Sequence, residues 1–372
     1  MERIFRKYFF IFLSFTILFL LPKKMTEKIR EQAIGVFTFS SKTGVSNRDN
    51  KEEEVQQMKL ENVLLSEQIQ QVGDFLSSEE RIESQLKHLE MIRENLDDKQ
   101  NENQKEFFLR REKHLLKRLK KQLMSLDGRV IYREPAFWSS YVWIDIGEQD
   151  NEAVKEKVVA LNSPVVMGDV AIGVIDYVAK KKSRVKLITD TSLSLSARIV
   201  RGSLQNKVLL EQLQLIYDQL KIREDLFFSL PEQENALKLL MSLSENIKSS
   251  VHDRYLAKGE IRGSSSPLWR SRGQSLVGIG FNYDYDDAEG RSRDLRTGES
   301  KDKKIKAEVL LRQGDLLVTA GFDGIFPEGF ILGLVEDVDS LEEGATFYNL
   351  KAKSLAPSYH ELRSLTVLAP LQ

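Results

Sequence analysis

Residues 51–126 constrain the chain most strongly, because apolar side chains recur there at steps of three and four residues without an intervening proline. This spacing keeps one apolar stripe along one side of a helix. Such a stripe is too narrow to be buried by its own helix, so it predicts a coiled coil with a second helix. The residues that we predict to mediate this self-association are Val55, Met58, Leu65, Ile69, Val72, Leu116, Leu119 and Leu123.

The length of this stretch predicts a rod. A continuous helix of this length would reach about 110 Å at about 1.5 Å per residue, far beyond an ordinary globular helix. The segment 97–105 lacks apolar seam residues, so we expect the coil to splay there. The rod would separate the N-terminal segment from the C-terminal part of the chain.

The N-terminus predicts a membrane anchor. Residues 8–21 read YFFIFLSFTILFLL, after Arg3, Arg6 and Lys7. A cleaved secretion signal is the alternative, but Pro22 and Lys23 follow where small residues at a cleavage site are expected. We therefore predict an uncleaved transmembrane helix. Basic residues flank it on both sides, so the charges do not decide its orientation.

After Gly128 the periodicity changes from helical to alternating, and short Val- and Ile-rich runs predict antiparallel strands. Helical spacing returns at residue 204, and Pro231 marks the start of a second helix. We predict a membrane-anchored α+β protein with two small antiparallel β-barrel domains and an inserted helical hairpin. Its divisions are an N-terminal tail and transmembrane signal anchor (1–30), a linker (31–50), a coiled coil (51–127), a first β-barrel region (128–203), the hairpin insertion (204–258) and a second β-barrel region (259–372).

Composition excludes several classes of site. The 55 Lys and Arg residues against 56 Asp and Glu give no sign of nucleic-acid binding. The chain has no cysteine, which excludes disulfides and thiolate ligands, and its four histidines show no metal-ligand spacing. We therefore predict no cofactor and no metal.

Matches to enzyme motifs do not fit their structural context. Three Ser-x-x-Lys matches begin at Ser84, Ser183 and Ser300, and residues 42–44 read KTG. In penicillin-recognising serine enzymes the serine motif precedes KTG, whereas here KTG comes first. No carboxylate stands in an apolar setting that would raise its pKa for acid or base catalysis. We predict that the protein is not an enzyme.

The stretch 314–338, GDLLVTAGFDGIFPEGFILGLVEDV, is the most specific motif of the chain. It resembles the GDxVxTSGxxGxFPxGxxVGxV signature of the MreC rod shape-determining proteins, with Ala320 in place of serine and Leu332 in place of valine. Residues 164–189 also resemble a run of that family, whereas the hairpin departs from its usual pattern. The matching positions that we single out are Gly314, Asp315, Thr319, Gly321, Gly324, Phe326, Pro327, Gly329 and Gly333.

The resemblance implies a single-pass protein of the inner membrane with its coiled coil and barrels in the periplasm. Proteins of this family are non-catalytic scaffolds of peptidoglycan synthesis and cell shape that self-associate, as a homodimer or larger. They link MreB, through MreD and RodA, to a class B penicillin-binding transpeptidase. The motif glycines are then fold residues first and a binding site only by extension. The alternative is a periplasmic adaptor of an export pump, in which the hairpin would project and bind a channel.

Overall fold

The computed structural model describes residues 102–133, 139–154, 157–226, 230–247, 253–264, 274–284, 294–299, 307–357 and 362–371. The chain divides into two compact units, residues 1–77 and 78–372, and all described residues belong to the second. The predicted anchor, the linker and residues 51–101 of the predicted coiled coil lie outside the described residues. Across the described part, no helix is both long and apolar enough to span a membrane.

The end of the predicted rod is helix α4 (Glu102–Leu123). Its last turn carries Lys120 and Lys121, which suit the negative end of the helix dipole. Strand β1 (Ser125–Arg133) begins directly after it. The helix therefore ends four residues before the predicted boundary at residue 127, because Ser125 already pairs with Leu368.

Within the described residues, six strands close into a first barrel, in the order β1, β2, β5, β4, β3, β12 and back to β1. All these pairings are antiparallel. Side chains such as Val142, Ile175 and Val367 fill its core. A short 3-10 helix, η2 (Glu148–Ala153), follows β2. Besides β1, the strands are β2 (Tyr141–Ile144), β3 (Pro164–Met167), β4 (Val170–Val178), β5 (Ser183–Leu187) and β12 (Ser364–Leu368).

Another six described strands close into a second barrel, in the order β6, β7, β8, β11, β10, β9 and back to β6. Leu195, Phe281, Phe326 and Phe330 lie in its core. The strands are β6 (Ser194–Arg201), β7 (Arg254–Gly263), β8 (Ser275–Tyr283), β9 (Leu316–Thr319), β10 (Ile331–Val338) and β11 (Tyr348–Ser354).

The boundary between the two barrels differs from the predicted one. Strand β6, which we predicted in the first barrel region, closes the second barrel, and β12, from the chain's end, closes the first. A single parallel bridge, Ile331 with Val170, joins β10 of the second barrel to β4 of the first, whereas the described pairings within each barrel are antiparallel as predicted. Alternation along a strand reports which face is buried but not which distant strand pairs with it, so the sequence pattern missed this exchange.

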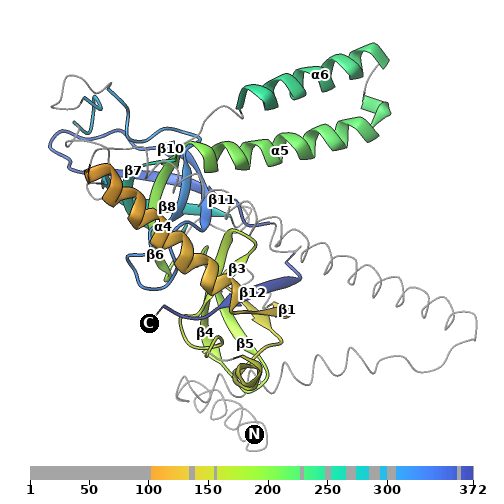
Figure 1. Ribbon diagram of the computed structural model, residues 1–372, viewed down its shortest axis with the longest axis vertical. Coiled ribbons are helices and arrows are strands. Elements are labelled where there is room, and N and C mark those ends of the chain that lie inside the picture. Colours follow the sequence, from red (N-terminus) through yellow and green to blue (C-terminus); the bar gives the residue numbers. More distant parts are fainter. Residues whose placement is uncertain are drawn as a thin grey trace, which may run out of the picture. The chain divides into compact units, whose positions relative to one another are not determined.

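An antiparallel helical hairpin connects β6 to β7, as Figure 1 shows. It consists of α5 (Ser203–Ile222), a 3-10 turn η3 (Glu224–Leu226) and α6 (Leu230–Ile247). Asn206 Nδ2 donates to the carbonyl of Ile247 (3.1 Å), and Gln233 Nε2 donates to that of Leu220 (3.0 Å). The second helix ends at Ile247, before the predicted end of the insertion at residue 258, because Arg254 already pairs with Arg201 in the barrel.

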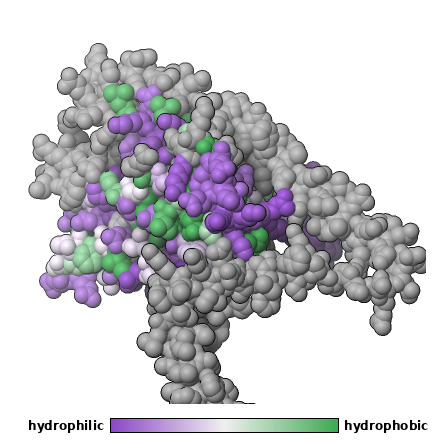
Figure 2. All heavy atoms as spheres, turned by 90° about the horizontal axis from the view of Figure 1, so that it is seen from below, coloured by the Kyte–Doolittle hydropathy of each residue, from purple (hydrophilic) through white to green (hydrophobic). Residues whose placement is uncertain are grey.

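On the face of the molecule drawn in Figure 2, apolar residues form small groups between hydrophilic ones. Most large apolar side chains of the barrels lie in their cores, whereas Leu161, Phe322 and Phe347 are exposed.

Candidate functional site

The candidate site is the motif turn, residues 314–333, which contains β9, the connection to β10 and the start of β10. Gly314, Gly321, Gly324 and Gly329 all have positive φ, between 69° and 93°. L-residues with a side chain rarely adopt this conformation, so the backbone itself requires these glycines. Gly333 is required differently: a Cβ there would lie 2.3 Å from the carbonyl oxygen of Lys353 on β11.

The inner side of the motif turn is held by Thr319, which is fully buried. Its Oγ1 donates to the carbonyl of Pro327 (2.6 Å) and accepts from the backbone N–H of Phe330 (3.0 Å). The rings of Phe326 and Phe330 pack edge to face, with centroids 6.3 Å apart. These motif residues therefore serve the barrel core, as the sequence analysis predicts.

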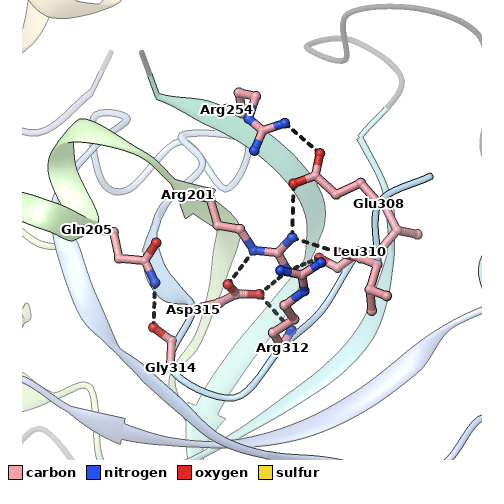
Figure 3. Close-up of polar contacts among 9 residues, drawn as sticks. Arg201, Gln205, Arg254, Glu308, Leu310, Arg312, Gly314 and Asp315 are labelled. Carbon is pink, nitrogen blue, oxygen red and sulfur yellow. Dashed lines mark hydrogen bonds and ion pairs between the residues drawn. The ribbon is translucent and has the colours of Figure 1, made fainter. Parts of the chain in front are cut away.

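A buried ion pair anchors the start of the motif turn (Figure 3). Arg201, at the end of β6, binds Asp315 in a bidentate manner, with Nε–Oδ1 at 2.6 Å and Nη2–Oδ2 at 2.7 Å. Asp315 is 2% exposed and Arg201 is 8% exposed. Both charges are therefore removed from water, and neither is stable there without its partner.

The remaining hydrogen-bonding groups of this pair are also occupied. Arg201 Nη1 donates to the carbonyl of Val309 (2.7 Å) and lies 3.3 Å from Glu308 Oε1. Asp315 Oδ2 accepts from the backbone N–H of Arg312 (2.7 Å). Arg254 of β7 binds the other oxygen of Glu308 (2.6 Å) (Figure 3). The network joins β6, β7 and the approach to β9, so it fixes this end of the second barrel.

The outer side of the motif turn presents an exposed aromatic ring. Phe322 is 58% exposed, and its backbone N–H donates to Ser196 Oγ (3.1 Å). Asp323 accepts from the backbone N–H groups of Ser196 (2.9 Å) and Ile325 (2.8 Å), which fixes the turn. A large ring held on a rigid turn loses little conformational freedom when a partner covers it.

Two cations lie beside this ring. Arg198 Cζ is 4.8 Å from the Phe322 ring centroid, and Lys258 Nζ is 5.0 Å from it. Both cations also pair with the buried carboxylate of Asp284. Sequence reasoning missed Phe322, although an aromatic residue in the glycine-rich turn GFDG was a readable signal of exposure.

Helix α4 docks on the same motif turn. Arg118 Nη1 donates to the carbonyl of Gly329 (2.8 Å), and its guanidinium lies 5.8 Å from the Phe330 ring centroid. His114 contacts Glu328. A Cβ at residue 329 would lie 2.7 Å from Arg118 Nη1, so Gly329 leaves room for the arginine. Lys121 Nζ reaches the carbonyl of Pro370, after β12 of the first barrel (3.2 Å).

This docking changes the interpretation of the predicted seam residues in α4. Leu119 is 6% exposed in the single chain, so it is buried without a second helix and does not fit the self-association role that we predicted for it. Leu116 is 46% exposed and remains accessible. Leu123 ends α4, and its side chain is outside the described atoms. Val55, Met58, Leu65, Ile69 and Val72 lie outside the described residues.

The described Ser-x-x-Lys match does not form a catalytic pair. Ser183 is fully buried on β5, and Lys186, three residues along the same strand, points to the opposite face. Lys186 instead donates to Ser192 Oγ (3.1 Å). Among the described residues, no group of His, Asp and Glu side chains has the arrangement of a metal site.

A family model described as "Rod shape-determining protein MreC, barrel core" matches residues 130–234 and 272–369, which is more than half of the chain. The match contains every motif position that the sequence analysis singles out. A search of curated proteins found no match.

Several solved structures are similar. MreC of Listeria monocytogenes is 19% identical, with a TM-score of 0.39, over 78% of this chain and 95% of that one. MreC of Pseudomonas aeruginosa is 18% identical, with a TM-score of 0.36, over 65% and 97%. MreC in a complex with penicillin-binding protein PBP2, both from Helicobacter pylori, is 14% identical, with a TM-score of 0.32, over 66% and 98%.

Proposed function

The chain belongs to the MreC family of rod shape-determining proteins, and from this premise we propose that it is a non-catalytic scaffold that organises peptidoglycan synthesis. The observation that carries the proposal is the family match across both barrels. The motif turn agrees with a scaffold role, because its polar groups bind one another and its glycines serve the backbone. The motif residues therefore maintain the fold, and other residues on the barrel surface would bind the partner.

We propose that the chain crosses the inner membrane once through residues 1–30 and places its barrels in the periplasm. The segment 51–127 would pair with a second copy through its apolar stripe. Of the seam residues in α4, Leu116 is accessible for this pairing, whereas Leu119 would first have to leave its present contacts. The inner-membrane partners would be MreD and RodA, with MreB on the cytoplasmic side.

The proposed partner of the barrels is a class B penicillin-binding transpeptidase. The contact that we propose on this chain is Phe322 on the motif turn, because it is a rigid, exposed aromatic residue flanked by Arg198 and Lys258. Aromatic and arginine side chains are enriched among residues that carry binding energy at interfaces. Arg198 and Lys258 already pair with Asp284, so the exposed ring itself would make the contact.

Depletion of the protein in its own host tests this proposal against the pump-adaptor alternative. The scaffold predicts that rod-shaped cells become round and that labelled cell-wall precursors are no longer incorporated along the cylinder. The adaptor instead predicts lost export of its substrate in cells of unchanged shape. The second result would overturn the proposal. The α5–α6 hairpin is a feature that an adaptor would use, whereas family membership favours the scaffold.

A further inference from the structure

The α5–α6 hairpin leaves large aliphatic side chains exposed. Leu209 and Ile216 on α5 are 43% and 44% exposed, and Leu239 and Leu243 on α6 are 61% and 42% exposed. Side chains of this size are usually buried, and four of them on one short hairpin mark it as a surface for binding.

The hairpin's own seam follows a heptad. Seam residues recur at steps of four and three on both helices, and each is partly or fully buried. Hydrogen bonds between the two helices at both ends of the seam fix their antiparallel register. The seam residues are Asn206, Leu210, Leu213, Tyr217 and Leu220 on α5, and Gln233, Leu237, Leu240, Ser244 and Ile247 on α6.

The two sides that flank this seam differ in charge. In an antiparallel pair, residues that precede a seam position by one on either helix lie on the same side of the pair. That side, which we call the uncharged face, carries Leu209, Gln212, Ile216, Gln219, Ala236, Leu239, Leu243 and Asn246, with Gln205 at its base and Glu232 at its tip. The opposite side, the charged face, carries Lys207, Glu211, Asp218, Lys221, Glu234, Lys238, Met241 and Glu245.

Other exposed apolar residues do not belong to the uncharged face. Leu215 and Ile222 lie on the outer edge of α5, and Met241 lies among the charges. Glu232 does lie on the side of the uncharged face, but at its tip, in the first turn of α6. The uncharged face is therefore the one side on which aliphatic residues from both helices adjoin one another.

The chemistry of the uncharged face indicates its occupant. It has no Lys or Arg for phosphate groups, and no aromatic residue of the kind that anchors helices at a lipid surface. A strongly charged protein partner would lose solvation there without gaining ion pairs. The same face of a second copy satisfies it, because aliphatic and amide side chains meet their own kind and the single charged residue described on this face, Glu232, lies at the tip where the contact would end.

The available area is large enough for such a contact. Helix α5 has 20 residues, so a face about 30 Å long and two helices wide covers about 600 Å² per copy, or about 1,200 Å² in total. This value is at the lower end of specific interfaces, which bury about 1,200–2,000 Å².

We propose that the uncharged face binds the same face of a second copy, so that two hairpins form an antiparallel four-helix bundle. This contact is independent of the coiled coil at residues 51–127 and of the proposed role in cell-wall synthesis. If the coiled coil also pairs as proposed, two self-association surfaces on each chain would join dimers into longer assemblies.

Single cysteines test the proposal directly, since the native chain has none. Ile216→Cys and Leu243→Cys would be introduced singly in the full-length protein, in membranes, and oxidised or treated with a short bismaleimide, alone and as a mixture of the two variants. Met241→Cys on the charged face is the matched control, because its exposure (53%) is similar. We expect covalent dimers from the uncharged face at about ten times the control yield.

Equal yields from the two faces would overturn the proposal, as would crosslinks from Ile216→Cys and Leu243→Cys only to other proteins. A cysteine at Leu65 reports the coiled coil in the same assay. Failure at the hairpin with success at Leu65 would thus remove this inference and leave the proposed scaffold intact. Charge substitutions provide a second readout: Ile216→Lys should abolish the hairpin crosslink through Leu243→Cys, whereas Met241→Lys should not change it.

Discussion

The motif turn and the α5–α6 hairpin emerge from the same barrel but differ in how they use their side chains. In the motif turn, Asp315 and Thr319 are buried and bind groups within the chain. In the hairpin, by contrast, Ile216 and Leu239 expose about half of their surface. Side chains already satisfied inside the fold contribute stability, whereas exposed apolar ones remain available for a partner.

The residues of the motif and the residues best placed to bind a partner are different residues. A residue of the motif is identified by what the barrel needs, such as the positive φ of Gly329 or the hydroxyl of Thr319. The residues best placed for binding, Phe322 and the uncharged face, fall between the motif positions or outside the motif. Substitutions in the two regions should therefore affect different measurements.

The largest expected effect is at the buried ion pair. Asp315→Asn removes the bidentate partner of the buried Arg201 guanidinium and leaves it only the longer contact with Glu308 (3.3 Å), so we expect a loss of about 3 kcal/mol in the free energy of unfolding. Denaturant unfolding of the purified protein, followed by circular dichroism, measures it. The double variant Arg201→Met, Asp315→Leu removes both charges and should recover most of the loss. A double variant as unstable as the single one would contradict this account.

Gly329→Ala should reduce the free energy of unfolding by less than Asp315→Asn does. Alanine at φ +93° is strained by about 1–2 kcal/mol, and its Cβ would also displace Arg118. Gly324→Ala is the matched control, since its φ is +69° but no atom lies within 4 Å of the added Cβ. The thermal unfolding temperature of Gly329→Ala should be lower than that of Gly324→Ala. Equal transitions would mean that the docking of α4 does not depend on this glycine.

Substitutions on the hairpin should leave folding almost unchanged. Ile216→Lys places a charge at an exposed position, so we expect a change of less than about 0.5 kcal/mol in the free energy of unfolding. Unfolding and hairpin crosslinking should be measured on the same preparation, so that lost crosslinking can be distinguished from lost folding. A large loss of stability would show that the uncharged face packs within its own chain.

The smallest effect on stability is expected at Phe322. Phe322→Ala removes a ring that is 58% exposed, so unfolding should again change by less than about 0.5 kcal/mol. Recovery of the transpeptidase with the tagged protein from solubilised membranes should nevertheless fall. Phe347→Ala is the control, because Phe347 is similarly exposed (46%) but follows β10. Equal recovery for the two variants would remove Phe322 from the proposed contact.

Local features of the fold were readable from the sequence, whereas distant pairings were not. The short Val- and Ile-rich runs after Gly128, such as residues 142–147 and 184–189, predicted strands, and β2 and β5 lie there. Which strands close each barrel depends on contacts between residues far apart in the chain, such as Thr366 with Val166. No local pattern encodes them.

The candidate site was likewise predictable in its local features but not in its distant contacts. The motif positions were recognised, and their role in the fold agrees with the buried side chains of Thr319 and Phe326. The sequence did not reveal that Arg201, 114 residues before Asp315, is its partner. Nor did the heptad spacing of Leu119 distinguish docking on a barrel from docking on a second helix, because both bury the same stripe.

Crosslinking in living cells tests the central claim most directly, namely that the barrels of this scaffold bind a cell-wall synthase. A photoreactive amino acid would replace Phe322, with Phe347 as the control position, and mass spectrometry would identify the captured proteins. The account predicts a class B penicillin-binding transpeptidase from position 322 and much less of it from position 347. Capture of transporter subunits from position 322, without a transpeptidase, would contradict it.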